Sequence, residues 1–120
     1  MRAKLELKAY NAAELYYDLE DYQAAIQSFE NVLKDFPDTK NRVEIGYMII
    51  RSSYLLAKNS FVEKQKERFT DAVERASEFL ERYGDSRYAD EVQKMYEQST
   101  DQLKELENVR YQDQSTGARS

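Results

Sequence analysis

Residues that interrupt helices are almost absent from this chain. Its 120 residues include three glycines and one proline, far fewer than an average protein of this length contains. Because glycine and proline are the least favourable residues in a helix interior, few positions can end a helix. The chain is also rich in Ala, Leu, Glu, Lys and Arg, which favour helices. The sequence therefore predicts an all-α fold built from long helices.

Apolar residues recur every three or four positions in five stretches, which is the spacing of one helix face. The stretches run from about 3 to 19, 22 to 36, 43 to 55, 60 to 84 and 87 to 109. The third is apolar around most of its circumference, which indicates a helix that lies between others. The fourth is expected to contain about 22 helical residues, a length of roughly 33 Å. We therefore expect about five helices within residues 1–109.

Two further signals concern the ends of these helices. Ser60 followed by Glu63 has the spacing of a capping box, in which side chains satisfy free amides, so the fourth helix is expected to begin there. The segment Glu63–Arg68 is mostly charged and is expected to face solvent. Residues 110–120 are polar and lack an apolar stripe, so we predict that they form a flexible tail.

Charge and hydropathy exclude several classes of partner. A chain of 120 residues fits one domain. The net charge of -5 disfavours nucleic-acid binding, because phosphates require clustered Lys and Arg. No stretch approaches the ~18 consecutive apolar residues of a membrane helix. Charge and hydropathy therefore disfavour nucleic acid as a partner and a membrane-spanning helix within these residues.

The sequence offers no catalytic, cofactor-binding or metal-binding residues. Histidine and cysteine are both absent, which removes the commonest general base, thiol chemistry and the commonest transition-metal ligands. Acidic groups such as Asp18, Glu20 and Asp21 have no loop of metal-ligand spacing around them, so we interpret them as a solvated helix end. We therefore expect no enzyme activity, no cofactor and no metal.

An internal repeat is visible in the sequence. The segments Asp35–Thr39 and Arg82–Ser86 each follow an apolar helix and contain an aromatic residue, a helix breaker, Asp and a hydroxyl residue, at an offset of 47. Ala25 matches Ala72 at this offset, whereas the preceding helices match at an offset of 38. The second unit is therefore expected to carry about nine extra residues between its helices.

These repeated positions resemble the tetratricopeptide repeat (TPR) family. In the first unit the family's spaced positions are filled by Ala9, Ala12, Ala13, Tyr16, Tyr22, Ala25, Phe29, Val32 and Pro37. The second unit keeps Tyr47, Ile50, Tyr54, Phe69, Ala72, Phe79 and Leu80, but Arg51 stands where the family usually has a small residue. The resemblance implies antiparallel helix hairpins in a right-handed superhelix. Repeat one spans about 5–39, repeat two about 43–86 with a lengthened second helix, and a terminal helix about 87–109.

More narrowly, the chain looks like the C-terminal repeats of the BamD-related outer-membrane assembly lipoproteins. The similarity lies in the two corner segments, the charged elongated helix pair and the terminal helix. It implies a non-catalytic scaffold at the periplasmic face of the bacterial outer membrane, with other assembly components as partners. Members of that family carry an N-terminal lipidated Cys and further repeats, so membrane association is expected only through an anchor outside these residues.

TPR domains bind partners along the concave face made by the first helix of each repeat. In this register the expected partner-binding residues are Leu7, Tyr10, Glu14, Tyr17, Ile45, Met48, Ser52 and Leu55. A groove bearing Tyr and Met suits a helix or an extended segment of another protein. Glu14 would repel a carboxylate, which argues against the terminal-carboxylate clamp of cytosolic TPR proteins. The alternative is that a further repeat or the terminal helix covers some of these residues.

Two other functions stay open at this point. One is a generic TPR adaptor with an unrelated partner, in the cytosol or the periplasm. The other is a regulatory module of a larger protein. The partner, the oligomeric state and the extent of the natural chain do not follow from these residues.

Overall fold

The computed structural model describes the backbone of residues 2–119 and the side chains of residues 2–108. Within this range all regular structure is helical, which confirms the predicted all-α class. The five helices are α1 (Arg2–Asp18), α2 (Tyr22–Asp35), α3 (Arg42–Lys58), α4 (Val62–Tyr83) and α5 (Ala89–Arg119). The lengthened α4 has 22 residues, as predicted.

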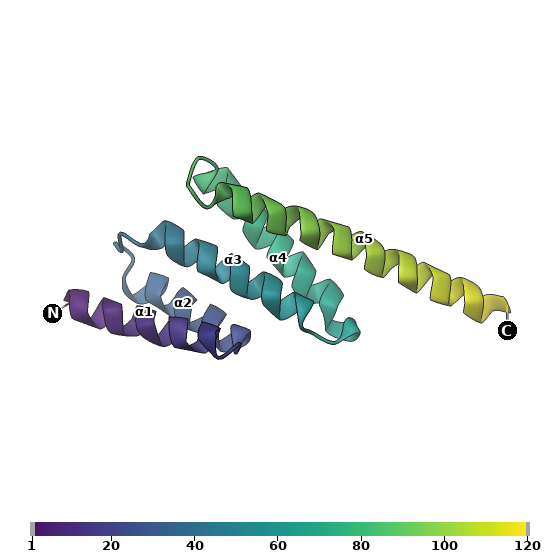
Figure 1. The fold of residues 1–120 in the computed structure, drawn as a ribbon, viewed down its shortest axis with the longest axis horizontal. Coiled ribbons are helices and arrows are strands. Elements are labelled where there is room, and N and C mark those ends of the chain that lie inside the picture. The colour runs from purple at the N-terminus through teal and green to yellow at the C-terminus, as the bar shows by residue number, and fades with distance from the viewer. Residues whose placement is uncertain (1, 120) are drawn as a thin grey trace.

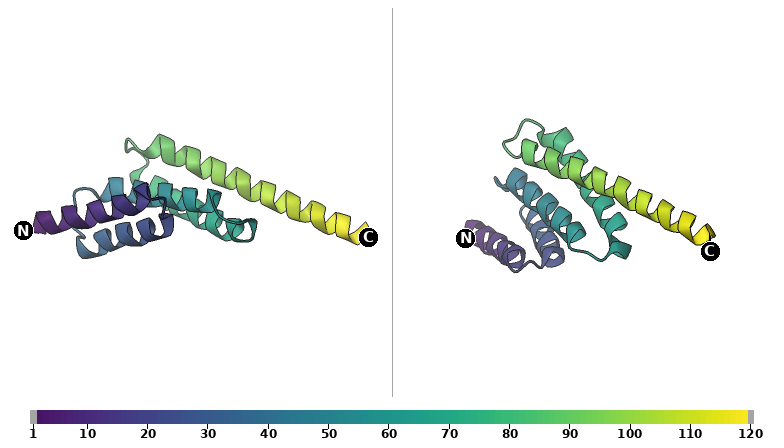
Figure 2. Two further views of the ribbon diagram at one scale, coloured as in Figure 1. Left: turned by 60° about the horizontal axis from the view of Figure 1, so that its bottom comes forward. Right: turned by 45° about the vertical axis from the view of Figure 1, so that its right-hand side comes forward.

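The helices form two layers. Each packs against the next along the chain, and α3 also contacts α5. In Figure 1, α1, α3 and α5 lie towards the viewer and α2 and α4 lie behind them. The molecule is elongated, 67 × 29 × 19 Å, and its two ends lie far apart (Figure 2). This is the stacked-hairpin arrangement expected of TPR repeats.

The first hairpin packs at the positions that the TPR register predicts. Ala13, Ala25 and Phe29 are fully inaccessible to solvent, and Val32 is nearly so. Ala25 fits because α1 and α2 cross closely at this point, leaving no room for a larger side chain. Tyr16, another position of the family pattern, is 40% exposed.

Helix α3 contributes to two cores. Its Ile45 and Ile49 join the first hairpin's buried cluster. On another side, Tyr47 and Ile50 pack with Phe79 of α4 and with α5. The prediction that this largely apolar helix lies between others is therefore confirmed.

The offset of 47 extends further along the chain than the sequence suggested. Ile45 and Val92 are separated by 47 residues, and both are completely buried. Ser52 and Ser99 have the same separation, and their exposed fractions are 0% and 1%. The repeating unit is therefore α2 with α3, matched by α4 with α5.

Two equivalent hydrogen bonds show that positions of α1 correspond to positions of α3 that lie 37 residues later. The Tyr10 hydroxyl donates to Glu44, and the Tyr47 hydroxyl donates to Glu91. The tyrosines are separated by 37 residues and the glutamates by 47, so about ten residues are added in the second hairpin, close to the nine expected. In this register Ala13 corresponds to Ile50, and Arg51 does not occupy the inward-facing position.

The added residues lengthen the helices of the second hairpin, and the turn between α3 and α4 stays as short as the turn between α1 and α2. Most of them are the first two turns of α4, Val62–Arg68, which are largely exposed as expected. Gln65 Nε2 lies 3.4 Å from the carbonyl oxygen of Ala57 and 3.5 Å from that of Lys58. The extension thus covers carbonyl groups at the C-terminus of α3, which have no partners within their own helix.

The predicted capping box at Ser60 is wrong. Helix α4 begins at Val62, and Phe61 stands at its N-cap without a side-chain hydrogen bond. The Ser60 hydroxyl instead donates back to the carbonyl oxygen of Leu56 and accepts a 2.6 Å hydrogen bond from Arg68. A serine after a helix can bond to the preceding turn, and here that option prevails.

Helix α5 continues beyond its predicted end. We expected it to stop near Val109, whereas the helix extends to Arg119. The side chains from residue 109 onward lie outside the described residues. The flexibility of residues 110–120 therefore stays a prediction.

Candidate protein-binding face

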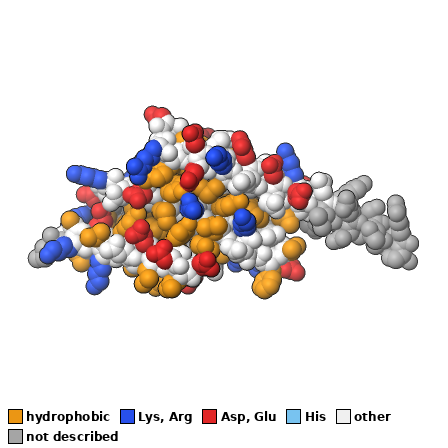
Figure 3. All heavy atoms as spheres, viewed as in Figure 1, with side chains coloured by type: hydrophobic (Ala, Val, Ile, Leu, Met, Phe, Trp, Pro, Cys, Tyr) orange, Lys and Arg blue, Asp and Glu red, His pale blue; other side chains and the backbone are white. Residues whose placement is uncertain are grey.

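The face formed by α1, α3 and α5 is the candidate partner-binding surface, called here the α1–α3–α5 face. Figure 3 shows it in space-filling form, with apolar side chains gathered over α3 between α1 and α5 and charged side chains around them. In a stack of TPR hairpins this is the face made by the first helices.

A hollow of about 430 Å³ lies between α1 and α3 on this face. Its lining residues are Ala3, Glu6, Leu7, Tyr10, Glu14, Asn41 and Glu44. The structure therefore brings together the predicted residues Leu7, Tyr10 and Glu14. Three carboxylates line the hollow, which supports the argument that it does not hold the terminal carboxylate of a partner.

Tyr10 joins α1 to α3 and also packs inside its own hairpin. Its hydroxyl donates a 2.9 Å hydrogen bond to Glu44, and its ring meets Phe29 edge-on with centroids 5.7 Å apart. Burial, the bond to Glu44 and the nearby carboxylates raise the pKa of Tyr10 above that of a free tyrosine. Tyr10 is therefore both a surface residue and a packing residue.

Arg51 is the centre of a second bridge. Its Nε donates to the Tyr17 hydroxyl at 2.5 Å, and a terminal nitrogen donates to the Tyr47 hydroxyl at 2.8 Å. The same guanidinium lies 3.5 Å from the carboxylate of Glu91. One side chain thus links α1, α3 and α5, and its tyrosine partners raise the pKa of Arg51 further above its already high value.

Sequence reasoning missed Arg51 and Glu44 as members of this face. Arg51 was noted only as a departure from the family pattern, because the offset of 38 placed it opposite Ala13. The Tyr and Glu spacings that repeat at 37 and 47 would have pointed to the pairs Tyr10–Glu44 and Tyr47–Glu91, and so to Glu44, but not to Arg51. No single-helix pattern contains that signal, since each bridge joins two helices.

The remaining predicted residues divide into two groups. Tyr17, Met48 and Leu55 are partly exposed, as a binding role requires. Ile45 and Ser52 are fully buried, so their placement on the open face is wrong. They are seven residues apart, so they share one side of α3, and that side packs on α2.

Other chemistry is not visible in the part of the chain that the structure describes. No three acidic side chains there are grouped so that they could hold a metal ion. None of the described helices combines the length and the apolar character needed to cross a membrane.

Comparison with known families agrees with this geometry. A family model described as YfiO, outer membrane lipoprotein, matches residues 3–115. The chain belongs to this family. The match covers α1 to α4 and most of α5, and it confirms the resemblance to BamD-like TPR lipoproteins. A search of curated proteins gave no match. Membership in the YfiO family indicates a role in protein interaction.

Proposed function

We propose that this chain is a non-catalytic scaffold that holds components of the outer-membrane protein assembly machinery at the periplasmic face of the outer membrane. Family membership supports the setting, and the hollow between α1 and α3 supports the mode of binding. The hollow combines apolar side chains with carboxylates and a tyrosine. Farther along α3, Met48 and Leu55 are partly exposed.

The face is suited to a helix or an extended segment of another protein. Leu7 is 59% exposed and offers an apolar contact at the edge of the hollow. Met48 adapts readily to a partner because its side chain is unbranched and polarisable. The bridges through Tyr10 and Arg51 hold the three first helices in place, so the face is formed before a partner arrives.

The experiment replaces one exposed and two partly exposed apolar residues of the face and leaves the residues of the bridges unchanged. We expect Leu7→Ser, Met48→Ser and Leu55→Ser together to weaken partner binding at least tenfold, since apolar anchors dominate such interfaces. The variant is made in the full-length natural protein, which is captured from its host, and the retained proteins are identified. Circular dichroism checks that helicity is unchanged.

A matched control places the same kind of change elsewhere. Phe61 and Val62 are 85% and 67% exposed at the turn between α3 and α4, so Phe61→Ser with Val62→Ser should leave capture unaffected. Loss of assembly components with the control but not with the triple variant would rule out the α1–α3–α5 face. Capture of proteins unrelated to outer-membrane assembly would instead favour the generic adaptor.

A further inference from the structure

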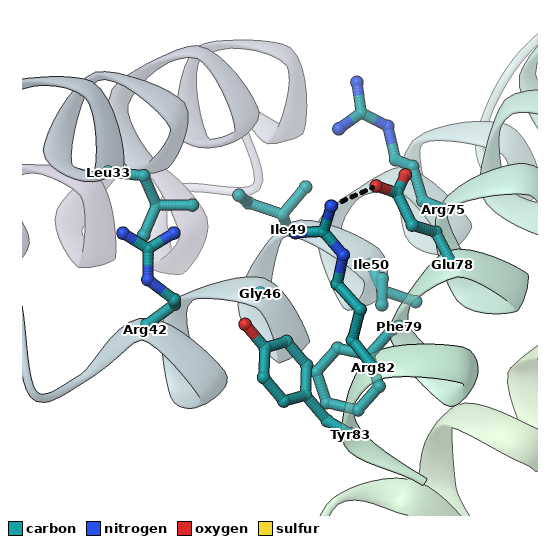
Figure 4. A pocket seen from close by; sticks show the side chains of 10 residues that line it. All are labelled: Leu33, Arg42, Gly46, Ile49, Ile50, Arg75, Glu78, Phe79, Arg82 and Tyr83. Atoms are coloured by element: carbon teal, nitrogen blue, oxygen red, sulfur yellow. Dashed lines mark ion pairs between the residues drawn. The ribbon is translucent and has the colours of Figure 1, made fainter. Parts of the chain in front are cut away.

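A second hollow lies on the opposite side of α3, in the groove between α2 and α4, called here the α2–α4 groove. It has a volume of about 180 Å³ and is open to solvent (Figure 4). Its floor is formed by Gly46, Ile49 and Ile50 of α3 and by Phe79 of α4. Gly46 and Met48 are two residues apart, so at 3.6 residues per turn they point in nearly opposite directions. The groove is therefore separate from the α1–α3–α5 face.

Gly46 at the floor of the groove is not required by packing. It lies inside α3, where glycine is less favourable than alanine, and its φ is not positive. A Cβ atom there would lie 3.4 Å and 3.5 Å from two ring carbons of Phe79, which is ordinary contact. Gly46 lines the hollow, so a side chain at this position would take up part of its volume.

Two arginines flank the mouth of the groove and keep part of their donor capacity. Arg82 lies 3.6 Å from Glu78, and both side chains are about two-thirds exposed, so this ion pair is weak. Arg42 donates to the carbonyl oxygen of Pro37 and has no carboxylate partner among the described residues. A guanidinium has five N–H donors, so both arginines can donate further hydrogen bonds to the carboxylate of a partner.

The third arginine of the groove has a different role. Arg75 lies 3.0 Å from Glu30 of α2 and 2.9 Å from Asp71 of its own helix. These two partners satisfy it and tie α4 to α2 across the groove. The cationic character that a ligand meets therefore comes from Arg42 and Arg82, with the Tyr83 hydroxyl lying between them in the view of Figure 4.

Size and charge together define the ligand. A cavity of about 150 Å³ is enough for a benzene-sized molecule, so this hollow accommodates one large apolar side chain and is too small for an acyl chain. Arginine is well suited to carboxylates because its planar fork forms paired hydrogen bonds. We propose that the α2–α4 groove binds an extended segment of a partner protein in which a large apolar side chain lies next to an aspartate or glutamate.

The test uses short peptides and methyl NMR on the 120-residue chain. The δ1 methyls of Ile49 and Ile50 report on the groove, and that of Ile45, which does not line it, is the internal reference. The probe is a capped tetrapeptide, acetyl-Ser-Glu-Leu-Ser-amide. The peptide should shift the methyl signals of Ile49 and Ile50 and leave that of Ile45 unchanged. Replacing its Glu by Gln, or its Leu by Ala, should weaken binding about tenfold in each case.

Protein variants separate this proposal from nonspecific attraction. Gly46→Ala should raise the Tm by a few degrees, because glycine is unfavourable in a helix, and yet weaken the Glu-Leu peptide severalfold. Arg42→Gln with Arg82→Gln should reduce binding of the Glu peptide to that of the Gln peptide. Arg2→Gln removes an arginine at an exposed site on α1 and should leave binding of both the Glu peptide and the Gln peptide unchanged.

Three results would overturn the proposal. The first is equal binding of the Glu and Gln peptides, which would remove the role of the arginines. The second is unchanged binding to Gly46→Ala. The third is an equal response to octanoate, which would point to a small carboxylic acid and not to a protein segment. Each concerns the α2–α4 groove alone, so none bears on the scaffold function proposed for the opposite face.

Discussion

The pair α2–α3 and the pair α4–α5 are two versions of one packing unit, 47 residues apart. Small or apolar residues occupy the same buried places in both, such as Ala25 with Ala72 and Ile45 with Val92. The unit therefore joins the second helix of one repeat to the first helix of the next. Because both junctions use the same buried positions, successive repeats stack in the same way. The helices within one repeat can differ in length from those of the other, as α4 does from α2.

The two units fill their cores differently. Phe29 and Val32 of α2 correspond to Ala76 and Phe79 of α4, so the large aromatic ring has moved by one helical turn. All four side chains are at least 95% buried. At this pair of positions the comparison shows that a buried phenylalanine can stand on either of two adjacent turns of the second helix.

The largest effect is expected from removing that ring in the first unit. Phe29→Ala should lower the free energy of unfolding by about 3–5 kcal/mol, because it leaves a cavity in a fully buried site. Adding Val32→Phe copies the arrangement of the second unit and should recover about half of the loss. Chemical denaturation of both variants gives the measurement. If the second change destabilises further, the two units do not tolerate the same exchange.

An intermediate effect is expected where the helices cross closely. Ala25→Trp and Ala72→Trp should each cost at least ~1–3 kcal/mol, since neither site has spare volume. Similar losses at both sites are expected because they are equivalent in the 47-residue register. Ala12→Trp, on an exposed part of α1, is the control and should leave the Tm nearly unchanged. Unchanged thermal midpoints for both buried variants would contradict the register.

The smallest effect concerns the matched bridges Tyr10–Glu44 and Tyr47–Glu91. Burial and the adjacent carboxylate raise the pKa of both tyrosines above the usual value of 10.0. The folded state therefore favours the protonated tyrosines. Their contribution to the free energy of unfolding is present below about pH 10 and is lost as the pH rises through their pKa values in the folded state. Tyr10→Phe and Tyr47→Phe should each flatten the loss of stability above about pH 10. Denaturation curves across that range measure it, and an unaltered slope in both variants would show that the bridges are not coupled to stability.

Much of the fold follows from the sequence alone because helix signals are local. The five helices, the 22-residue length of α4 and the burial of Ala13, Ala25 and Phe29 were all predictable from spacing and helix breakers. The offset between α1 and α3 was harder. Helix α3 is apolar on most sides, so its sequence gives a weak signal of which side faces which neighbour.

The candidate site was predictable only in part, because exposure depends on neighbouring helices. Ser52 is fully buried, whereas Leu15, its counterpart on α1, is 57% exposed. Helix α3 packs against α2, α4 and α5, but α1 packs extensively against α2 alone within the described chain. The sequence cannot distinguish these two situations from the residues of one helix. The α2–α4 groove was missed for a similar reason, since its lining comes from three helices.

The order of contacts in this fold has a consequence for how the chain is made and how it yields to force. Every extensive contact joins helices adjacent in the chain, apart from the smaller one between α3 and α5. Such local topologies fold rapidly, and each hairpin can form as soon as it leaves the ribosome. The two ends lie at opposite extremes of the long axis (Figure 2), so a pull between them acts along the stack. We therefore expect the molecule to lengthen in steps, one helix peeling from the next, and not to rupture in a single event.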